Sequence, residues 1–375
     1  MENHASLFVN TSFIISCMAM AIVFITLPLP SNKGLKQYRI SLRLLACAYL
    51  AIAILKAGAI AFDFVAVDLL SLEILTISSL QASLFTIALI TLLRPGFITR
   101  CLLYIQIAPL LILNVTYWLA AIWWGNPVVR NYQELSEMVF HPSIIIRELL
   151  LVYYIAQLFY LTRIFVLQVR NYENELDNYF AETYRLHLPW VKYCFLASLS
   201  IGISAIIPCL MAIEPLFMVL TVIYIIFYMV FGICYIQYPR TYLYIEPVIY
   251  PGIYTPEETS KYNRRLNWEE LKESILTEKY YLKPEVNIED MAHHLKIGRT
   301  TLSKFINSEE KKNFNGWINS LRIDEAKQLL HDFPEYTLIE ISEMVGYSES
   351  SNFSREFKHI TNISPSAWKQ NFKSE

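Results

Sequence analysis

Charged residues are scarce in this sequence. They make up 17% of its 375 residues, whereas 55% are hydrophobic, and the apolar excess lies before about Tyr238. This composition excludes an ordinary soluble globular protein, in which about a quarter of the residues are charged. Seven stretches of at least about 20 mainly apolar residues are long enough to span a bilayer as helices. They cover residues 7–27, 40–62, 69–93, 101–124, 144–168, 190–211 and 215–238.

Catalytic and metal-binding motifs are missing. The sequence has no GxxxxGK[ST], GxGxxG, HExxH or nucleophile-elbow pattern. His293 and His294 are adjacent, so a helix directs their side chains about 100° apart and they cannot hold one metal ion from a single face. The six cysteines form no CxxC motif, so we predict small core residues rather than disulfide or metal partners. We therefore predict no enzyme activity, no cofactor and no metal site. The cysteines are Cys17, Cys47, Cys101, Cys194, Cys209 and Cys234.

Basic residues are also missing from the N-terminus, and elsewhere they gather in alternate connections. Because Met1 to His4 contain no Lys or Arg, the first apolar stretch is predicted to be an anchor and not a cleaved signal peptide. The connections after the second, fourth and sixth stretches contain one Lys or Arg, which is Arg130. The connections after the first, third and fifth, together with the adjoining ends of the flanking stretches, contain ten. By the positive-inside rule, we predict that the N-terminus lies outside the membrane and the C-terminus in the cytoplasm. The ten cations are Lys33, Lys36, Arg39, Arg43, Arg94, Arg100, Arg163, Arg170, Arg185 and Lys192.

Four ionisable residues inside the apolar stretches are candidates for a ligand or signal site, because charge in a bilayer is costly. They are Lys56, Glu73, Arg147 and Glu148. Lys56 can pair with Glu73, and a structural pair or an interfacial anchor is the alternative to a functional site. No repeated proton-relay series is present, which favours a sensor over a transporter.

Two connections are longer than the others. The outer one, residues 125–143, is either a ligand-binding lid or a simple loop. The inner one, residues 170–190, has Tyr172, Leu176, Tyr179 and Phe180 at helical spacing beside an acidic face. Because acidity opposes binding to anionic lipid, we predict contact with another protein segment, either the linker or a second subunit.

Residues 338–358 predict two short helices that meet at Gly346. Ile339, Ile341, Met344 and Val345 are the predicted buried face of the first helix. Gly346 suits a turn with a positive φ, and the hydroxyl of Ser348 is predicted to cap the second helix. Phe353 and Phe357, four residues apart, are predicted to point to the core. The alternative to a DNA-binding helix-turn-helix is an ordinary helical hairpin with a solvated face.

A second copy of this design lies upstream and favours the DNA-binding interpretation. Ile288, Met291, Ala292 and Leu295 predict one buried face, and Gly298 is the predicted turn. Leu302, Phe305 and Ile306 predict the anchor of the following helix. Between the copies, residues 314–330 predict a connecting helix. Its length can hold the second helices of the two copies, here called the probe helices, about 34 Å apart, which is one DNA turn.

The outward faces of the two probe helices combine small polar side chains with cations, which suits base and phosphate contacts in a major groove. The candidate DNA-binding residues are Arg299, Thr300, Ser303, Lys304, Ser350, Ser351, Ser354, Arg355 and Lys358.

Roughly the last hundred residues resemble the DNA-binding domain of the AraC/XylS family of bacterial transcription regulators. The resemblance rests on the Gly-Tyr-Ser and Asn-Phe-Ser-Arg-Glu-Phe-Lys pattern in 346–358, Ser364-Pro365-Ser366 with Trp368, residues 319–330, and residues 301–304. It implies double-stranded DNA and RNA polymerase as partners.

Three positions depart from the family pattern. Gly298 stands where the family often has a capping serine, Asn362 replaces a glycine, and Lys369 replaces an arginine. Asn362 tolerates the left-handed conformation well. From Lys261 onward, 17 Lys and Arg stand against 18 Asp and Glu, so non-specific phosphate affinity is predicted to be modest and a homodimer is one way to hold an operator.

We predict an all-α protein with three parts. Residues 1–240 form a seven-span transmembrane sensor or anchor domain, residues 241–266 a linker, and residues 267–375 a double helix-turn-helix domain. The predicted function is a membrane-integral transcription regulator whose partners are DNA, the lipid bilayer and an unidentified ligand or membrane protein. The alternatives are a transporter or channel with a DNA-binding feedback domain, and release of the C-terminal domain by proteolysis.

Overall fold

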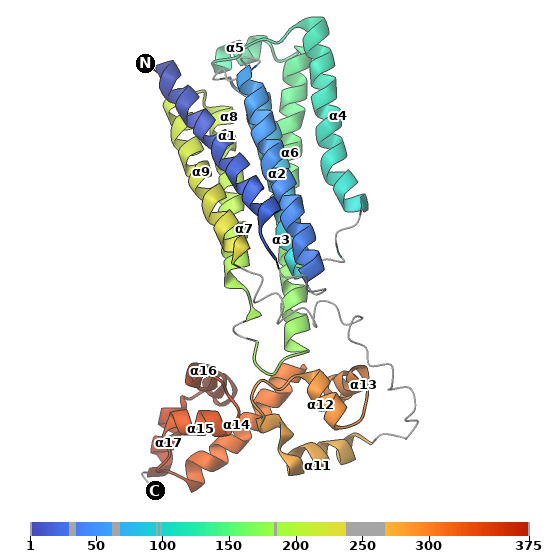
Figure 1. Ribbon diagram of the computed structural model, residues 1–375, viewed down its shortest axis with the longest axis vertical. Coiled ribbons are helices and arrows are strands. Elements are labelled where there is room, and N and C mark those ends of the chain that lie inside the picture. The colour runs from blue at the N-terminus through green and yellow to red at the C-terminus, as the bar shows by residue number, and fades with distance from the viewer. Residues whose placement is uncertain are drawn as a thin grey trace. The chain divides into compact units, whose positions relative to one another are not determined.

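A computed structural model of the chain (Figure 1) is helical throughout the residues it describes, apart from turns and one isolated β-bridge between Phe180 and Asn287. It describes residues 2–29, 35–61, 68–94, 97, 100–183, 186–237 and 267–373. The predicted linker, residues 241–266, lies outside these ranges. By contacts between residues the chain divides into two compact units. Unit 1 consists of Met1–Arg170 and Leu188–Glu246, and unit 2 of Asn171–His187 and Pro247–Glu375.

Unit 1 is built from long apolar helices. They are α1 (Glu2–Thr26), α2 (Lys36–Ala61), α3 (Leu72–Leu93), α4 (Arg100–Trp124), α5 (Tyr132–Glu137), α6 (Pro142–Asp177), α7 (Pro189–Ser204), α8 (Ile206–Leu210) and α9 (Glu214–Ile236). Seven helical segments of the described chain are long and apolar enough to cross a membrane. They coincide with the seven predicted stretches, except that α6 continues to Asp177. The last seven residues of α6, from Asn171, belong to unit 2.

Buried tyrosines tie α2, α3 and α9 together. The hydroxyl of Tyr38 donates to the carbonyl of Tyr235 at 2.7 Å, and that of Tyr49 donates to the carbonyl of Tyr228 at 2.7 Å. The hydroxyl of Tyr235 in turn donates to the carbonyl of Ala88 at 3.0 Å. Each ring therefore fills apolar space while its hydroxyl has a partner.

A polar network joins α3, α4 and α6. The Gln157 side chain accepts a hydrogen bond from Ser79 at 2.6 Å and donates to Ser83 at 2.7 Å and to Gln106 at 3.1 Å. Hydrogen bonds between helices are one of the forces that hold apolar bundles together, because apolar surface alone gives little specificity there.

Unit 2 contains the C-terminal helices. They are α11 (Trp268–Glu278), η5 (Tyr280–Leu282), α12 (Ile288–His294), α13 (Arg299–Phe305), η6 (Ile306–Glu310), α14 (Phe314–Asp332), α15 (Leu338–Met344), α16 (Ser350–Thr361) and α17 (Pro365–Lys373). Asparagine side chains cap α11, α12 and α14, and a Thr337–Glu340 capping box begins α15.

The predicted connecting helix is confirmed as α14, and both halves of unit 2 pack on it. Near its start, Trp317 contacts the ring of Trp268, with ring centroids 5.5 Å apart. Further along, Ile323 and Ala326 share a core with Phe353 and Phe357, as predicted for the two phenylalanines. One helix thus carries both halves of the unit.

The predicted buried face of α15 is partly wrong. Ile341 and Val345 are buried, but Ile339 is 60% exposed and Met344 is 44% exposed. Ser342 takes a core position instead, with 1% exposure. At 100° per residue, Ile339 lies about 200° around the helix from Ile341, so the two cannot face the same core.

The cysteine prediction holds for three of the residues whose burial the structure describes. Cys17, Cys194 and Cys209 are buried and free. Cys234 is half-buried, and Cys47 is exposed because it lies on the outward face of α2, between the buried Ala46 and Ala48. The prediction of a core residue is therefore wrong for Cys47.

Candidate functional site

The second helix-turn-helix is formed by α15 and α16. Gly346 between them has φ +86°, as the sequence predicted, and a Cβ built there would lie 2.2 Å from the carbonyl oxygen of Leu282. Glycine is therefore required at this turn for its conformation and for its size. Asn362 ends α16 with φ +63°, which confirms the predicted left-handed asparagine.

The predicted cap of α16 is wrong. The helix begins after Glu349, which makes no side-chain capping bond, and the Ser348 hydroxyl donates to the Glu182 carboxylate at 3.1 Å. Ser348 lies one residue too early to cap, and a carboxylate from a distant part of the chain takes its hydroxyl. Sequence spacing alone could not show this partner.

The first helix-turn-helix is formed by α12 and α13. Its left-handed turn residue is Lys296, with φ +56°, and not Gly298. Gly298 has φ −75° and is the N-cap of α13. The turn therefore comes two residues earlier than predicted, and Gly298 does not adopt a backbone conformation that requires glycine.

The candidate DNA-binding residues lie on the outer sides of α13 and α16. Five of them are exposed: Thr300, Lys304, Ser351, Arg355 and Lys358. Four are half-buried: Arg299, Ser303, Ser350 and Ser354. Their role in DNA contact remains a prediction. The guanidinium of Arg355 is held within α16, because its Nη2 donates a hydrogen bond to the side chain of Asn352 at 3.1 Å.

A third part of unit 2 comes from far upstream. The segment Asn171–His187, here called the docking segment, comprises the last residues of α6 and the chain that follows it. Its Tyr172, Leu176 and Phe180 are buried. The sequence predicted that this stripe contacts the linker or a second subunit. Tyr179 and Phe180 of the stripe instead contact Ile288 and Asn287 in the helix-turn-helix unit of the same chain.

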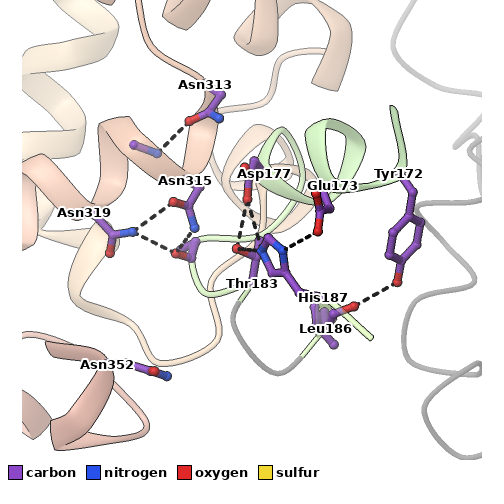
Figure 2. A network of polar contacts seen from close by, with 12 residues as sticks. Tyr172, Glu173, Asp177, Thr183, Leu186, His187, Asn313, Asn315, Asn319 and Asn352 are labelled. Atoms are coloured by element: carbon purple, nitrogen blue, oxygen red, sulfur yellow. Dashed lines mark hydrogen bonds and ion pairs between the residues drawn. The ribbon is translucent and has the colours of Figure 1, made fainter. Parts of the chain in front are cut away.

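The docking segment is joined to the start of α12 by main-chain hydrogen bonds. The amide of Ile288 donates to the carbonyl of Tyr179 at 2.8 Å, and the amide of Ala181 donates to the carbonyl of Val286 at 3.2 Å. These bonds form the bridge between Phe180 and Asn287. Two further bonds reach α14, because Asn315 and Asn319 both donate to the carbonyl of Ala181, at 2.7 and 3.2 Å. Figure 2 shows these two asparagines facing the docking segment.

Glu182 of the docking segment connects α14 with the start of α16. Its carboxylate accepts from Nη1 of Arg322 at 3.3 Å and from the backbone amide of Ser348 at 3.2 Å, in addition to the Ser348 hydroxyl. Burial lowers the pKa of the Arg322 guanidinium, and Tyr347 and Glu182 act against this shift. Nε and Nη2 of Arg322 donate to the carbonyls of Tyr281 and Lys283, so the buried charge is well compensated.

Tyr179 of the docking segment contacts a candidate DNA-binding residue directly. The Arg299 guanidinium lies over the Tyr179 ring, 5.1 Å from its centroid, and the Tyr179 hydroxyl donates to Glu289 at 2.5 Å. Burial, and then the hydrogen bond to Glu289, raise the pKa of Tyr179, so the phenol stays protonated and remains a donor. The docking segment thus touches the first residue of α13 and the residues just before α16.

The docking segment also has an internal polar cluster around His187. Figure 2 shows the imidazole between Glu173 and Thr183, with Asp177 nearby. Its Nδ1 lies 3.3 Å from Glu173, and its Nε2 lies 3.0 Å from Thr183 and 3.8 Å from Asp177. This cluster joins the end of α6, with Glu173 and Asp177, to Thr183 and His187, which follow the helix in the chain. Sequence reasoning missed it, because His187 and Glu173 are far from helical spacing.

Three of the four candidate signal residues of unit 1 belong to two ion pairs among the described residues. Lys56 contacts Glu73, which confirms the predicted pairing. Arg147 pairs with Asp68 at 2.7 Å, and not with its neighbour Glu148. Arg147 also donates to Tyr117 and Asn126, at 2.9 and 2.5 Å. Asp68 lies just before the third predicted apolar stretch, and its partner is 79 positions away, so no sequence pattern connects the two.

Comparisons with known proteins concern unit 2. Residues 291–371 match the model of a family described as a helix-turn-helix domain. The regulatory protein PocR of Salmonella typhimurium is 28% identical over 91 residues, which are 24% of this chain and 29% of PocR. The raffinose operon transcriptional regulatory protein RafR of Pediococcus pentosaceus is 30% identical over 83 residues, which are 22% of this chain and 30% of RafR.

A solved structure is similar to part of this chain. The C-terminal domain of AraT, a response regulator from Geobacillus stearothermophilus, is 26% identical, with a TM-score of 0.26, and the match covers 29% of this chain and 88% of that one. This chain spans less than a third of the length of PocR and of RafR. The matched residues, with the two helix-turn-helix units on α14, make the C-terminal part of this chain an AraC-type helix-turn-helix domain, joined to a separate helical region.

Proposed function

We propose that this protein is a membrane-integral, one-component transcription regulator. Its two helix-turn-helix units bind double-stranded DNA in a sequence-specific manner, and a signal received by unit 1 controls that binding. The seven apolar helices and the ten cations in alternate connections support an inner-membrane location with unit 2 in the cytoplasm. RNA polymerase and a second copy of the chain are the further partners that this function implies.

The observation that carries the proposal is the place of the docking segment. In the sequence it lies between the apolar parts of α6 and α7, yet it packs on the DNA-binding unit through Ala181 and Glu182. A shift of α6 or α7 within unit 1 therefore acts directly on unit 2. No separate signalling protein is needed between input and output.

The contacts of the docking segment also suggest the direction of control. Glu182 places a carboxylate at the amide of Ser348, just before α16, and helix N-termini are sites that attract anions such as DNA phosphate. Tyr179 holds Arg299 at the start of α13. The docked arrangement is thus the one with lower DNA affinity. A signal that favours the undocked arrangement raises the affinity by the difference in its binding to the two states.

Genome-wide DNA occupancy tests the function as a whole. We compare the full-length protein in its membrane with a version that begins at Lys261 and so lacks unit 1 and the docking segment. We expect both to occupy the same small set of promoters, because the reading residues lie on α13 and α16. Occupancy of no defined promoters by either version would contradict the proposal.

The variant Glu182→Gln tests the direction of control. It removes the charge before α16 and keeps the size of the side chain, so we expect about tenfold tighter promoter binding at low salt. The dependence of log K on log salt should steepen by about 0.9, which corresponds to one more phosphate contact. Glu335→Gln, an exposed glutamate between α14 and α15, makes the same change in net charge and serves as the control. Equal effects of the two variants would remove Glu182 from the mechanism.

A further inference from the structure

Unit 1 contains a cavity of about 540 Å³ that none of the features above explains. Its walls come from α2, α3, α4 and the start of α6, and most of them are apolar, including Ile54, Leu72 and Trp118. Pockets for small molecules measure about 300–1,000 Å³ and combine apolar walls with a few polar groups. By size and by lining, this cavity fits that description.

The charged groups of the cavity are already paired with each other. Glu73 lines it and contacts Lys56, while Arg147 and Asp68 both line it and form their own pair. A charged ligand would have to separate one of these pairs, and a buried charge left without its partner is strongly destabilising. The cavity therefore selects against ionic ligands.

Polar side chains that line the cavity can still form hydrogen bonds with an uncharged ligand. Lys56 contacts Oε1 of Glu73, and the structure gives Oε2 no hydrogen bond among the described residues. Arg147 also lines the cavity. Asn114, whose side chain bonds Thr76 and the carbonyl of Leu110, stands beside them in the lining. A hydroxyl group can donate to Glu73 and accept from a neighbouring donor without breaking either ion pair.

We propose that this cavity binds an uncharged amphiphile with a hydroxyl-bearing end and an apolar body, and that this molecule is the input of the regulator. The second clause rests on the proposed function, whereas the binding itself does not. The hydroxyl end lies against Glu73 and Asn114, and the apolar body lies along α2 and α4. Such a molecule comes either from the bilayer or from the solution on the outer side.

Gly58 of α2 allows the cavity to be filled without disturbing the fold. It lines the cavity, and a Cβ built on it has nothing within 4 Å. Gly58→Leu therefore extends into open space, and it also replaces a poor helix former by a good one. The neighbouring Ala57 is exposed and does not line the cavity, so Ala57→Leu adds a similar volume outside it.

The probe is a photoreactive decanol that carries a diazirine on its chain, added to full-length protein in phosphatidylcholine nanodiscs. We expect labelled peptides from α2, α3 and α4, and competition by unlabelled decanol. Labelling of these peptides should fall at least fivefold in Gly58→Leu and stay unchanged in Ala57→Leu. Equal labelling in both variants overturns the proposal.

Two matched probes test the selection against charge. Decanoate and decylamine with the same diazirine should label the cavity peptides at least fivefold less than the alcohol, and equal labelling by either one overturns the uncharged class. Gly58→Ala should give an intermediate loss, which separates filling of the cavity from misfolding of Gly58→Leu. Mass spectrometry of lipids bound to the purified protein then distinguishes the sources. If an uncharged lipid co-purifies with the protein, the ligand comes from the bilayer. If the purified protein holds no lipid but takes up decanol from the buffer, the ligand comes from the solution. A charged lipid that decanol displaces overturns the proposal.

Failure of this inference is separate from failure of the proposed function. If promoter occupancy is intact but labelling does not distinguish Gly58→Leu from Ala57→Leu, only the proposal of ligand binding in the cavity is contradicted. If the labelling pattern is as expected but the protein occupies no defined promoters, ligand binding is supported and the proposed regulatory function is contradicted.

Discussion

The two helix-turn-helix units share a design but are held in different ways. In the second unit, the turn residue Gly346 lies against the Leu282 carbonyl and a capping box begins α15. In the first unit, Lys296 makes the turn, Gly298 begins α13 without a side-chain cap, and α12 starts against the docking segment. Both units contact the docking segment: the second through the Glu182 side chain at Ser348, and the first through main-chain bonds at Val286 and Ile288. The start of α15 is capped by its own sequence, whereas the start of α12 is also paired with a distant main chain, which makes the first unit the better point of entry for a signal.

The largest expected effect separates the two glycines. Gly346→Ala should destabilise α15 and α16 by about 3 kcal/mol or more, because the new methyl group meets a backbone carbonyl at a positive φ. Gly298→Ala should change stability by less than about 1 kcal/mol, since its φ is −75° and its nearest neighbour, Thr301 Oγ1, is 3.6 Å away. Hydrogen exchange of the amides in α13 and α16 of the full-length protein measures both. Similar losses of protection in the two variants would show that the turns are equivalent.

The second effect concerns the arginines on the two probe helices. Arg355→Ala should weaken binding to a cognate promoter by about 1–3 kcal/mol and relax base preference, because this exposed side chain lies on the outer side of α16. Arg299→Ala should weaken it less while the docking segment is in place, since Tyr179 holds the guanidinium. Fluorescence anisotropy with promoter and scrambled DNA gives both values. Equal losses on the two DNA molecules would mean that Arg355 contacts only phosphate.

A smaller effect tests the local support of the second unit. Thr337→Ala removes the hydroxyl that accepts from the amide of Glu340 at 3.2 Å, and it should destabilise α15 by about 1 kcal/mol. The measurement is hydrogen exchange of the α15 amides. Thr337→Ser keeps the oxygen and should restore most of the protection. Protection that stays unchanged in the alanine variant would show that tertiary contacts alone hold this helix.

The smallest effect is a dependence on pH in the same capping box. The hydrogen bonds from the Thr337 backbone and side chain lower the pKa of Glu340. A carboxyl whose pKa is lower in the folded state stabilises the fold above its unfolded pKa, and this contribution is lost as the pH falls through the folded value. Protection of α15 should therefore decrease below about pH 4.3, the ordinary pKa of a glutamate. Glu340→Gln should lose this part of the dependence, and an identical pH profile in the variant would assign it to another group.

Much of unit 2 could be predicted because its signals are local. Phe353 and Phe357, four residues apart, were read correctly as core residues, and Gly346 was read correctly as a left-handed turn. The wrong predictions occur where two nearby residues could each take the same structural role. Gly298 predicts the turn because glycine is the commonest left-handed residue, yet Lys296 adopts that conformation and Gly298 is the N-cap of α13. Helical spacing likewise could not say which side of the short helix α15 faces α14.

The sequence alone determined the helices, the seven apolar stretches and the two helix-turn-helix units, because helical periodicity and turn residues act over a few positions. Only the tertiary structure decided which distant groups meet. Glu182 reaches Arg322 across 140 positions and Ser348 across 166, and Asp68 reaches Arg147 across 79. Such contacts leave no period in a sequence, since they depend on the path of the chain between their members. The docking segment and the cavity of unit 1 both arise from contacts of this kind.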